Sequence, residues 1–395
     1  MSSPDRPSHL YAEALYDGIG QSPRLRQVVE IAEGRITRVR DALPGEEAQL
    51  PRAPIVAPGF IDMQINGAAD VQFNFAPCAE SLARIAMGAR QGGTAHLLPT
   101  FITAPGQDYL LALEAGRAAL NHGVPGILGV HLEGPFLSPE RPGIHPAKAI
   151  RPLDEADLTA LCAEFPGVLM LTLAPECQPE GALARLAAAG VCLAIGHSAA
   201  SLAEVRTAEG DGLRLATHLF NAMPPLAGRD PGVVGAVLTS PRLHAGIIAD
   251  GVHVDWANIA LAHQMLGARL CAVTDAMLTL AGEAVTFDLY GQTVFRDKSR
   301  LANAQGRLAG AHIAMDETLR NLVHEVGLPL AEALAMTSTN PARALGLEQE
   351  LGRVTPGYRA SLTVLDRHLT AQAVVVDGCF FPRKSTGLAA GPRAE

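Results

Sequence analysis

The chain has 395 residues, of which 48% are hydrophobic and 18% are charged, so it can bury a large core. Its formal net charge is −9 and no run of Lys or Arg stands out, which argues against nucleic acid and anionic membranes as main partners. The six cysteines form no C-x-x-C pair, the first ten residues lack the apolar stretch of a signal peptide, and no run of about 18 apolar residues occurs. We therefore expect a cytoplasmic protein whose partner is a small molecule.

The two ends of the chain have the pattern of short strands. In segments 27–31 and 35–39 apolar residues alternate with polar ones, as in a half-exposed sheet. Segments 361–365 and 373–376 repeat this pattern. We therefore predict that residues 1–54 and 351–395 together form one small β-sandwich domain built from both termini.

Between these ends, residues 55–350 alternate apolar runs with Ala- and Leu-rich stretches of helical character. Eight of the runs are expected to be strands: Phe60–Ile65, Ala95–Pro99, Ile127–Leu132, Val168–Leu173, Cys192–Gly196, Leu215–Leu219, His244–Ala249 and Cys271–Thr274. Continuous apolar strands followed by helices are typical of a parallel sheet covered on both faces. No glycine-rich nucleotide-binding motif opens a helix. The sequence thus predicts an α/β fold with a (β/α)8 TIM-barrel catalytic domain, and a hairpin-bearing loop at 282–307.

Polar residues follow five of the predicted strands, at the end of a barrel where active sites lie. They are Glu133 after the third strand, His197 after the fifth, His218 after the sixth, Asp250 and His253 after the seventh, and Asp275 after the eighth. Each residue alone would more often be a structural group or a helix cap. Together at one mouth, two histidines and two carboxylates favour a catalytic metal site, in which three protein ligands leave a fourth position open.

The residue types indicate a hydrolytic reaction. Glu133, His197 and His218 can hold one divalent ion, which lowers the pKa of a water towards about 7. Asp275 can accept the proton of that water and pass it to a departing nitrogen. His145 and His253 are candidates for stabilising the oxyanion.

Several motifs resemble the amidohydrolase superfamily. Pro58–Asp62 resembles its first-strand signature, and Leu351–Leu362 resembles the stretch by which such chains re-enter the small domain. Within the superfamily, the chain is similar to the N-acetylglucosamine-6-phosphate deacetylases. The similar segments follow one another in order across nearly the whole chain: His131–Phe136, Gly143–His145, Gly196–Ser198, Thr217–Met223, Ala249–His253 and Val273–Ala276.

The resemblance implies hydrolysis of N-acetyl-D-glucosamine 6-phosphate to D-glucosamine 6-phosphate and acetate, in amino-sugar catabolism and recycling. It implies that Glu133, His197 and His218 bind one divalent ion per subunit, for which we predict zinc, and that Asp275 and His145 are catalytic. The implied substrate-binding residues are Ile144, His145, Asn221, Ala222, Arg229, Asp250, Gly251, Val252, His253, Leu308, Ala309 and Gly310.

Within this implied set, the phosphate and the acetyl group have separate contacts. Arg229 and His253 would hold the phosphate, and 308–310 would line the acetyl pocket. An Arg suits phosphate because its planar group donates two hydrogen bonds at once. We expect a homodimer, and the sequence leaves open whether Arg229 acts in its own subunit or in its neighbour.

One departure from the superfamily bears on the metal. The superfamily usually carries His-x-His after the first strand, whereas this chain has Gln64 and Asn66. An amide oxygen is a poor ligand for zinc, so we predict one ion rather than two. Ser361 also departs from the pattern, in the small domain, where the superfamily commonly has an acidic residue.

Two alternatives stay open: a deacetylase for N-acetylgalactosamine 6-phosphate, and a non-catalytic barrel that binds sugar phosphates. A cyclic amidase is disfavoured because the fourth strand carries no Lys that could bridge two metals. A non-catalytic barrel is disfavoured because Glu133, His197, His218 and Asp275 are all present.

Overall fold

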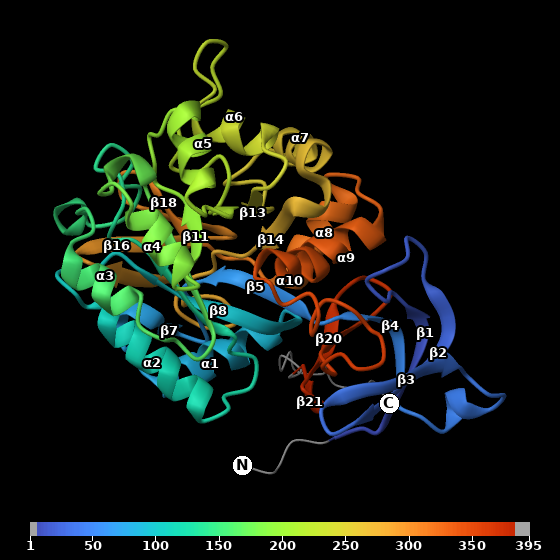
Figure 1. The fold of residues 1–395 in the computed structure, drawn as a ribbon. Helices are drawn as coiled ribbons and strands as arrows, with labels where there is room; N and C mark the ends of the chain where they lie inside the picture. The colour runs from blue at the N-terminus through green and yellow to red at the C-terminus, as the bar shows by residue number, and fades with distance from the viewer. Residues whose placement is uncertain (1–5, 384–395) are drawn as a thin grey trace, which may run out of the picture.

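Eight parallel strands form the centre of the computed structural model, which describes residues 6–383 (Figure 1). They are hydrogen-bonded in the order β14-β13-β12-β11-β10-β9-β8-β5. Their bounds are β5 Phe60–Ile65, β8 Thr94–Ile102, β9 Gly129–Glu133, β10 Val168–Leu173, β11 Cys192–Ile195, β12 Leu215–Ala216, β13 His244–Ile248 and β14 Leu270–Val273. Every residue of β5 and β8 is buried, as expected for strands covered on both faces. The eight predicted strands are confirmed, and so is the fold class.

Backbone hydrogen bonds close this sheet into a barrel between its first and last strands. The amide of Asp275 donates to the carbonyl of Gln64 at 2.8 Å, and the amide of Asn66 donates to the carbonyl of Ala276 at 2.8 Å. These bonds join the carboxyl ends of β5 and β14. They therefore bring Gln64, Asn66 and Asp275 together at the mouth of the barrel.

Helices surround the barrel in Figure 1. In chain order they are α1 Ala79–Arg90, α2 Tyr109–Asn121, α3 Glu155–Leu161, α4 Ala182–Ala188, α5 Leu202–Gly210, α6 Gly232–Thr239, α7 Trp256–Leu266, α8 Met315–His324, α9 Leu330–Thr337 and α10 Thr339–Ala344. The side chains of β5 face two cores. Phe60 and Ile65 share a core with residues of α1, whereas Ile61 and Met63 pack in a second core with residues of other strands and of α10. Ile65 departs from strict alternation because the pairing of β5 with β8 is irregular between Asp62 and Ile65.

A four-stranded antiparallel sheet interrupts the pattern after β14. It consists of β15 Thr286–Leu289, β16 Gln292–Asp297, β17 Arg300–Asn303 and β18 Leu308–Ala311. The predicted hairpin-bearing loop is thus a small sheet, and both predicted turns, at 290–291 and 305–306, connect its strands. A short pair, β6 Gly67–Ala68 and β7 Val71–Gln72, follows β5.

Strands from both ends of the chain form one further sheet, at the lower right of Figure 1. Its seven strands have the order β21-β20-β19-β4-β1-β2-β3. They are β1 His9–Leu15, β2 Arg24–Ala32, β3 Arg35–Asp41, β4 Arg52–Pro58, β19 Leu362–Leu365, β20 Ala371–Val376 and β21 Cys379–Pro382. The predicted union of the two ends is confirmed, and the division of the chain at residues 54 and 350 stays a prediction.

The seven-stranded sheet is attached to the barrel through β19. Ser361, beside this strand, lies with its hydroxyl 2.7 Å from Nε2 of the buried His96 in β8. The hydroxyl of Thr363 donates to the carbonyl of Gly93 at 2.8 Å. Ser361 therefore belongs to this junction.

Among residues 6–383, no helix has the length and apolar character needed to cross a membrane.

Candidate active site

The predicted metal ligands and Asp275 occupy the carboxyl ends of barrel strands. Glu133 is the last residue of β9, and the others each stand two residues beyond β11, β12 and β14. His197, His218 and Asp275 have φ angles of 48°, 31° and 50°. This left-handed region is uncommon for residues other than glycine and often marks functional sites.

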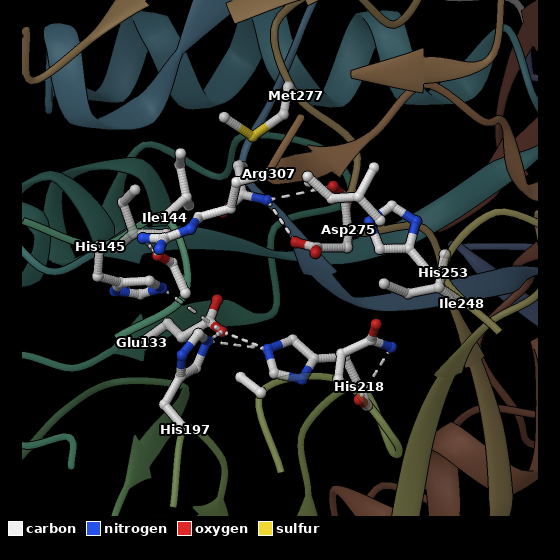
Figure 2. A pocket seen from close by; sticks show the side chains of 17 residues that line it. Glu133, Ile144, His145, His197, His218, Ile248, His253, Asp275, Met277 and Arg307 are labelled. Carbon is white, nitrogen blue, oxygen red and sulfur yellow. Dashed lines mark hydrogen bonds and ion pairs between the residues drawn. The ribbon is translucent and has the colours of Figure 1, made fainter. Parts of the chain in front are cut away.

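Glu133, His197 and His218 converge on one point (Figure 2). Nε2 of His218 lies 2.8 Å from Oε1 of Glu133, and Nε2 of His197 lies 3.1 Å from the same oxygen. The two Nε2 atoms are 3.1 Å apart. All three residues are at most 5% exposed. One carboxylate and two imidazole nitrogens facing each other in a buried space form a donor set that suits a divalent ion.

The atoms around these side chains also fit an ion. Nδ1 of His197 lies 2.9 Å from the carbonyl of Arg141, so it can donate there and leave Nε2 free as a ligand. Burial alone would raise the pKa of Glu133. The hydrogen bonds and charges of His197 and His218 outweigh burial and hold that pKa well below its usual value. Glu133 is therefore ionised, as a metal ligand must be.

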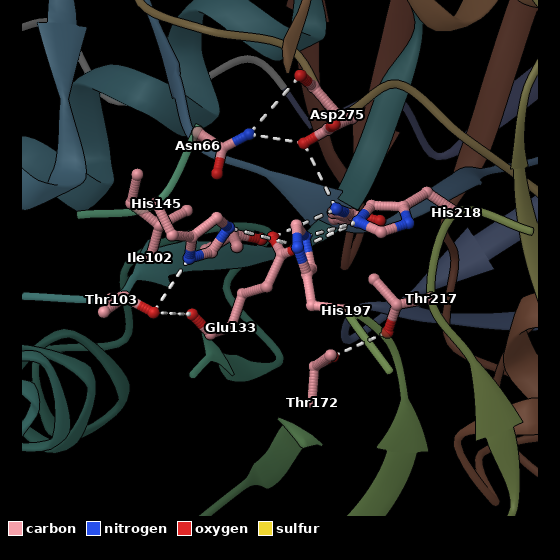
Figure 3. Close-up of polar contacts among 12 residues, drawn as sticks. Asn66, Ile102, Thr103, Glu133, His145, Thr172, His197, Thr217, His218 and Asp275 are labelled. Atoms are coloured by element: carbon pink, nitrogen blue, oxygen red, sulfur yellow. Dashed lines mark hydrogen bonds and ion pairs between the residues drawn. The ribbon is translucent and has the colours of Figure 1, made fainter. Parts of the chain in front are cut away.

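Two amide side chains, of Asn66 and Gln64, hold Asp275 beside this cluster; Figure 3 shows Asn66 beside Asp275. Nδ2 of Asn66 donates to Oδ1 of Asp275 at 2.6 Å. Nε2 of Gln64 lies 3.2 Å from the same oxygen and 3.2 Å from Oε2 of Glu133. Burial, and next the charge of Glu133, raise the pKa of Asp275 to about 6. A carboxylate whose pKa lies near neutrality is suited to accept and return a proton.

The two loop histidines are each held by a polar neighbour. Nδ1 of His145 lies 2.8 Å from the hydroxyl of Thr103, and its Nε2 lies 4.0 Å from Oε1 of Glu133. Burial, and next the charge of His197, lower the pKa of His145 to about 3, so its ring is neutral. Nδ1 of His253 lies 2.6 Å from Oδ2 of Asp250. Both rings are thus oriented before a ligand arrives.

These residues surround a cavity of about 260 Å³. Its lining residues are Asn66, Ile102, Glu133, Gly143, Ile144, His145, His197, His218, Asn221, Ala222, Ile248, His253, Asp275, Met277, Arg307, Leu308 and Gly310. The structure therefore brings together all of the predicted ligands and catalytic residues, and most of the predicted substrate contacts.

Five predicted substrate-binding residues do not line the cavity. Asp250 accepts hydrogen bonds from the amides of Val252 and His253, and it supports the His253 ring. Gly251 and Val252 complete this turn, and Ala309 is fully buried. Arg229 is exposed on the segment before α6, which projects from the barrel at the top of Figure 1.

The sequence prediction did not include several residues at the site. Thr103 and Arg307 are the most informative, because each contacts the loop that carries His145. Arg307 directly precedes the predicted segment 308–310, and this proximity was the one available signal. Ile102 and Ile248 belong to apolar strands, whose pattern indicates burial and nothing more.

Comparisons with known proteins agree with this geometry. Residues 55–383 match the amidohydrolase family. An N-acetylglucosamine-6-phosphate deacetylase from Haemophilus influenzae is 37% identical over 323 residues, which are 81% of this chain and 84% of that protein. An N-acetylgalactosamine-6-phosphate deacetylase from a Shewanella species is 34% identical over 357 residues, which are 89% of this chain and 90% of that protein.

One solved structure is similar to this chain over almost the whole length of both. The crystal structure of N-acetylglucosamine-6-phosphate deacetylase from Pasteurella multocida has a TM-score of 0.89 and 32% sequence identity to this chain. The match covers 95% of this chain and 100% of that one. Amidohydrolases depend on a metal, which the cluster of Glu133, His197 and His218 is built to hold. The chain belongs to the amidohydrolase family and, within it, to the deacetylases of N-acetylated amino-sugar 6-phosphates.

Proposed function

We propose that the protein hydrolyses N-acetyl-D-glucosamine 6-phosphate to D-glucosamine 6-phosphate and acetate, in amino-sugar catabolism and recycling. The observation that carries the proposal is the buried cluster of Glu133, His197 and His218 beside Asp275 in one cavity. The relative from Haemophilus influenzae and the structure from Pasteurella multocida, both named for this activity, support the choice of substrate.

Glu133, His197 and His218 would hold one divalent ion, which we propose to be zinc. Such an ion supplies a water of lowered pKa and polarises the acetyl carbonyl. A single ion is supported by Gln64 and Asn66, whose amide nitrogens donate to Asp275 and Glu133. Those two side chains hold carboxylates in place where the superfamily would bind a second metal.

Asp275 would take the proton of the attacking water and deliver it to the amide nitrogen. Asn66 occupies one of its oxygens at 2.6 Å, so Oδ2 is left for the proton. A raised pKa makes the protonated form accessible for the second half of this task.

His145 would donate a hydrogen bond to the acetyl oxygen. Because its ring is neutral, it needs the proton on Nε2, which follows if Nδ1 accepts from the hydroxyl of Thr103. Leu308, Ala309 and Gly310 would shape the acetyl pocket, and Ile144, Asn221 and Ala222 would contact the sugar.

The phosphate would be held by His253 and Arg229, with Asp250, Gly251 and Val252 forming the supporting turn. Asp250 keeps the His253 ring oriented through the contact between its Oδ2 and Nδ1 of His253. The exposed, projecting position of Arg229 suits a contact with the cavity of a second subunit, and we propose a homodimer on this ground. We further propose a cytoplasmic location, where phosphorylated amino sugars occur.

A second candidate substrate is the galactosamine epimer. Two relatives named N-acetylgalactosamine-6-phosphate deacetylases are 34% and 36% identical to this chain. Acetate release from both epimers, with and without prior chelation and metal restoration, tests the proposal. A higher kcat/KM for the glucosamine epimer that chelation removes is expected, whereas a higher value for the galactosamine epimer would reassign the substrate.

A further inference from the structure

The β15–β18 sheet contacts the loop of His145 through two hydrogen bonds that the barrel fold does not require. Nη1 of Arg307 donates to the carbonyl of Gly143 at 2.7 Å. Nε2 of Gln292 donates to the carbonyl of Ile144 at 3.3 Å. The two bonds hold consecutive residues of the loop immediately before His145.

Asn303 links these two donors. Its Nδ2 donates to Oε1 of Gln292 at 2.9 Å, and its Oδ1 accepts from the amide of Arg307 at 3.0 Å. Asn303 is only 8% exposed. Asn303 therefore holds the side chain of Gln292 and the backbone of Arg307 at one end of the sheet, from which both side chains reach the loop.

The loop in turn packs around His197. The backbone of Gly143 has a φ of 55°, and a Cβ on this residue would lie 2.8 Å from Cε1 of His197. The carbonyl of Arg141 lies 2.9 Å from Nδ1 of His197, and the ring centroids of His145 and His197 are 4.3 Å apart. A displacement of the loop would therefore move both histidines.

We propose that Arg307 and Gln292 are positioning residues that latch the loop 141–145 onto His197 and fix the place of His145. The role of His145 in this inference rests on the proposed function. The partners of metal-bound histidines tune metal affinity, and their loss typically costs about 10–100-fold. Arg307 contacts the loop that supports His197 and not His197 itself, so we expect its loss to weaken metal binding by about tenfold, the lower end of this range.

A different role for Arg307 would be to grip the phosphate, because it is the one Arg or Lys that lines the cavity in the described part of the chain. Its position argues for the latch. Figure 2 shows Arg307 beside Ile144 and above His145, across the cavity from His253, where the phosphate is proposed to bind. In addition, Nη1 of its guanidinium group already donates to the carbonyl of Gly143.

The test compares Arg307→Met, Arg307→Lys and Gln292→Leu with the wild type in the full chain. Arg296→Met is the matched control, because Arg296 lies in the same sheet and its side chain makes no hydrogen bond within residues 6–383. Hydrogen–deuterium exchange of the segment 138–147 and the rate of metal release to a chelator are measured without substrate. Arg307→Met should speed both, the metal release by about tenfold. Gln292→Leu should have a smaller effect, Arg307→Lys should restore part of the loss, and Arg296→Met should change neither.

Kinetics separate the latch from phosphate binding. Loss of the latch should lower kcat/KM about equally for the phosphorylated and the plain acetylated sugar, mainly through kcat, because both need His145. If Arg307→Met leaves exchange and metal release unchanged, the latch is wrong. It is also wrong if the loss is confined to KM for the phosphorylated sugar. Failure of the wild type to release acetate would contradict the proposed function, while exchange and metal release would still decide the latch.

Discussion

Two kinds of position contribute to the barrel mouth, the strand ends and the loops. Glu133 ends β9 and is fixed by its pairing with β8 and β10. Asp275 follows β14 and is fixed by the backbone bonds that close the barrel. His145 and His253 lie on loops, and each ring is held by a side chain, of Thr103 and Asp250 respectively. Changes at strand ends should therefore abolish the chemistry, whereas changes on loops should weaken it by degrees.

Removal of the metal should have the largest effect. Chelation is expected to reduce acetate release to the background rate, and one equivalent of divalent ion per chain should restore it, because the carboxylate and two imidazoles form one site. Metal analysis of the purified protein by mass spectrometry measures the stoichiometry. Two ions per chain, both needed for activity, would contradict the role given to Gln64 and Asn66.

Asp275→Asn should nearly abolish turnover while metal content is retained. The amide has almost the same shape as the carboxylate but cannot accept a proton, and such groups contribute about 10²–10⁴-fold. We expect the upper end, since Asp275 would act twice in the reaction. Asp297→Asn, at the exposed end of β16, is the control. A variant that keeps more than about a tenth of wild-type kcat would exclude Asp275 as the base.

Arg229→Ala tests the projecting segment before α6. A hydrogen bond to a charged group contributes roughly 1.5–3 kcal/mol, so KM for the phosphorylated sugar should rise by one to two orders of magnitude. Activity on the plain sugar should hardly change. Equal losses on both sugars would instead indicate a role in the fold or in the dimer.

The same variant tests the subunit to which the Arg belongs. Mixed dimers of Arg229→Ala and Asp275→Asn subunits would contain one site with both residues intact if Arg229 reaches across the interface. Recovery of part of the activity is expected. Its absence in verified mixed dimers would place Arg229 in the site of its own subunit.

Thr103→Val should have a smaller effect, because it removes one neutral hydrogen bond from a loop histidine. Thr103 is buried, and Val fills nearly the same volume. A bond of this kind contributes about 1 kcal/mol, which corresponds to roughly a fivefold loss of kcat. Thr103→Ser keeps the hydroxyl and should retain most of the activity. Metal content should be unchanged in both variants, and a loss of metal would show that Thr103 supports the ligands instead.

The difference between strand ends and loops also explains what could be predicted from the sequence. An apolar run followed by a polar residue is a local pattern, so Glu133 and Asp275 could be placed at one mouth. The contact of Arg307 with Gly143 joins residues 164 positions apart, and no local pattern marks it. The left-handed backbone of His197 was equally hidden, because in a residue other than glycine only the surrounding fold can impose it.

The smallest effect on chemistry should come from a change in the seven-stranded sheet, which lies away from the mouth. Ile36 of β3 is 1% exposed and packs in the core of that sheet. Ile36→Ala should lower the free energy of unfolding by about 2–5 kcal/mol, through lost burial and the cavity left behind. Ile19→Ala, at a position 63% exposed, is the matched control and should change stability little. Both variants should keep wild-type kcat at temperatures where they are folded, since Ile36 packs in a core cluster none of whose residues lines the cavity. A lowered kcat in fully folded Ile36→Ala would show that the seven-stranded sheet shapes the active site.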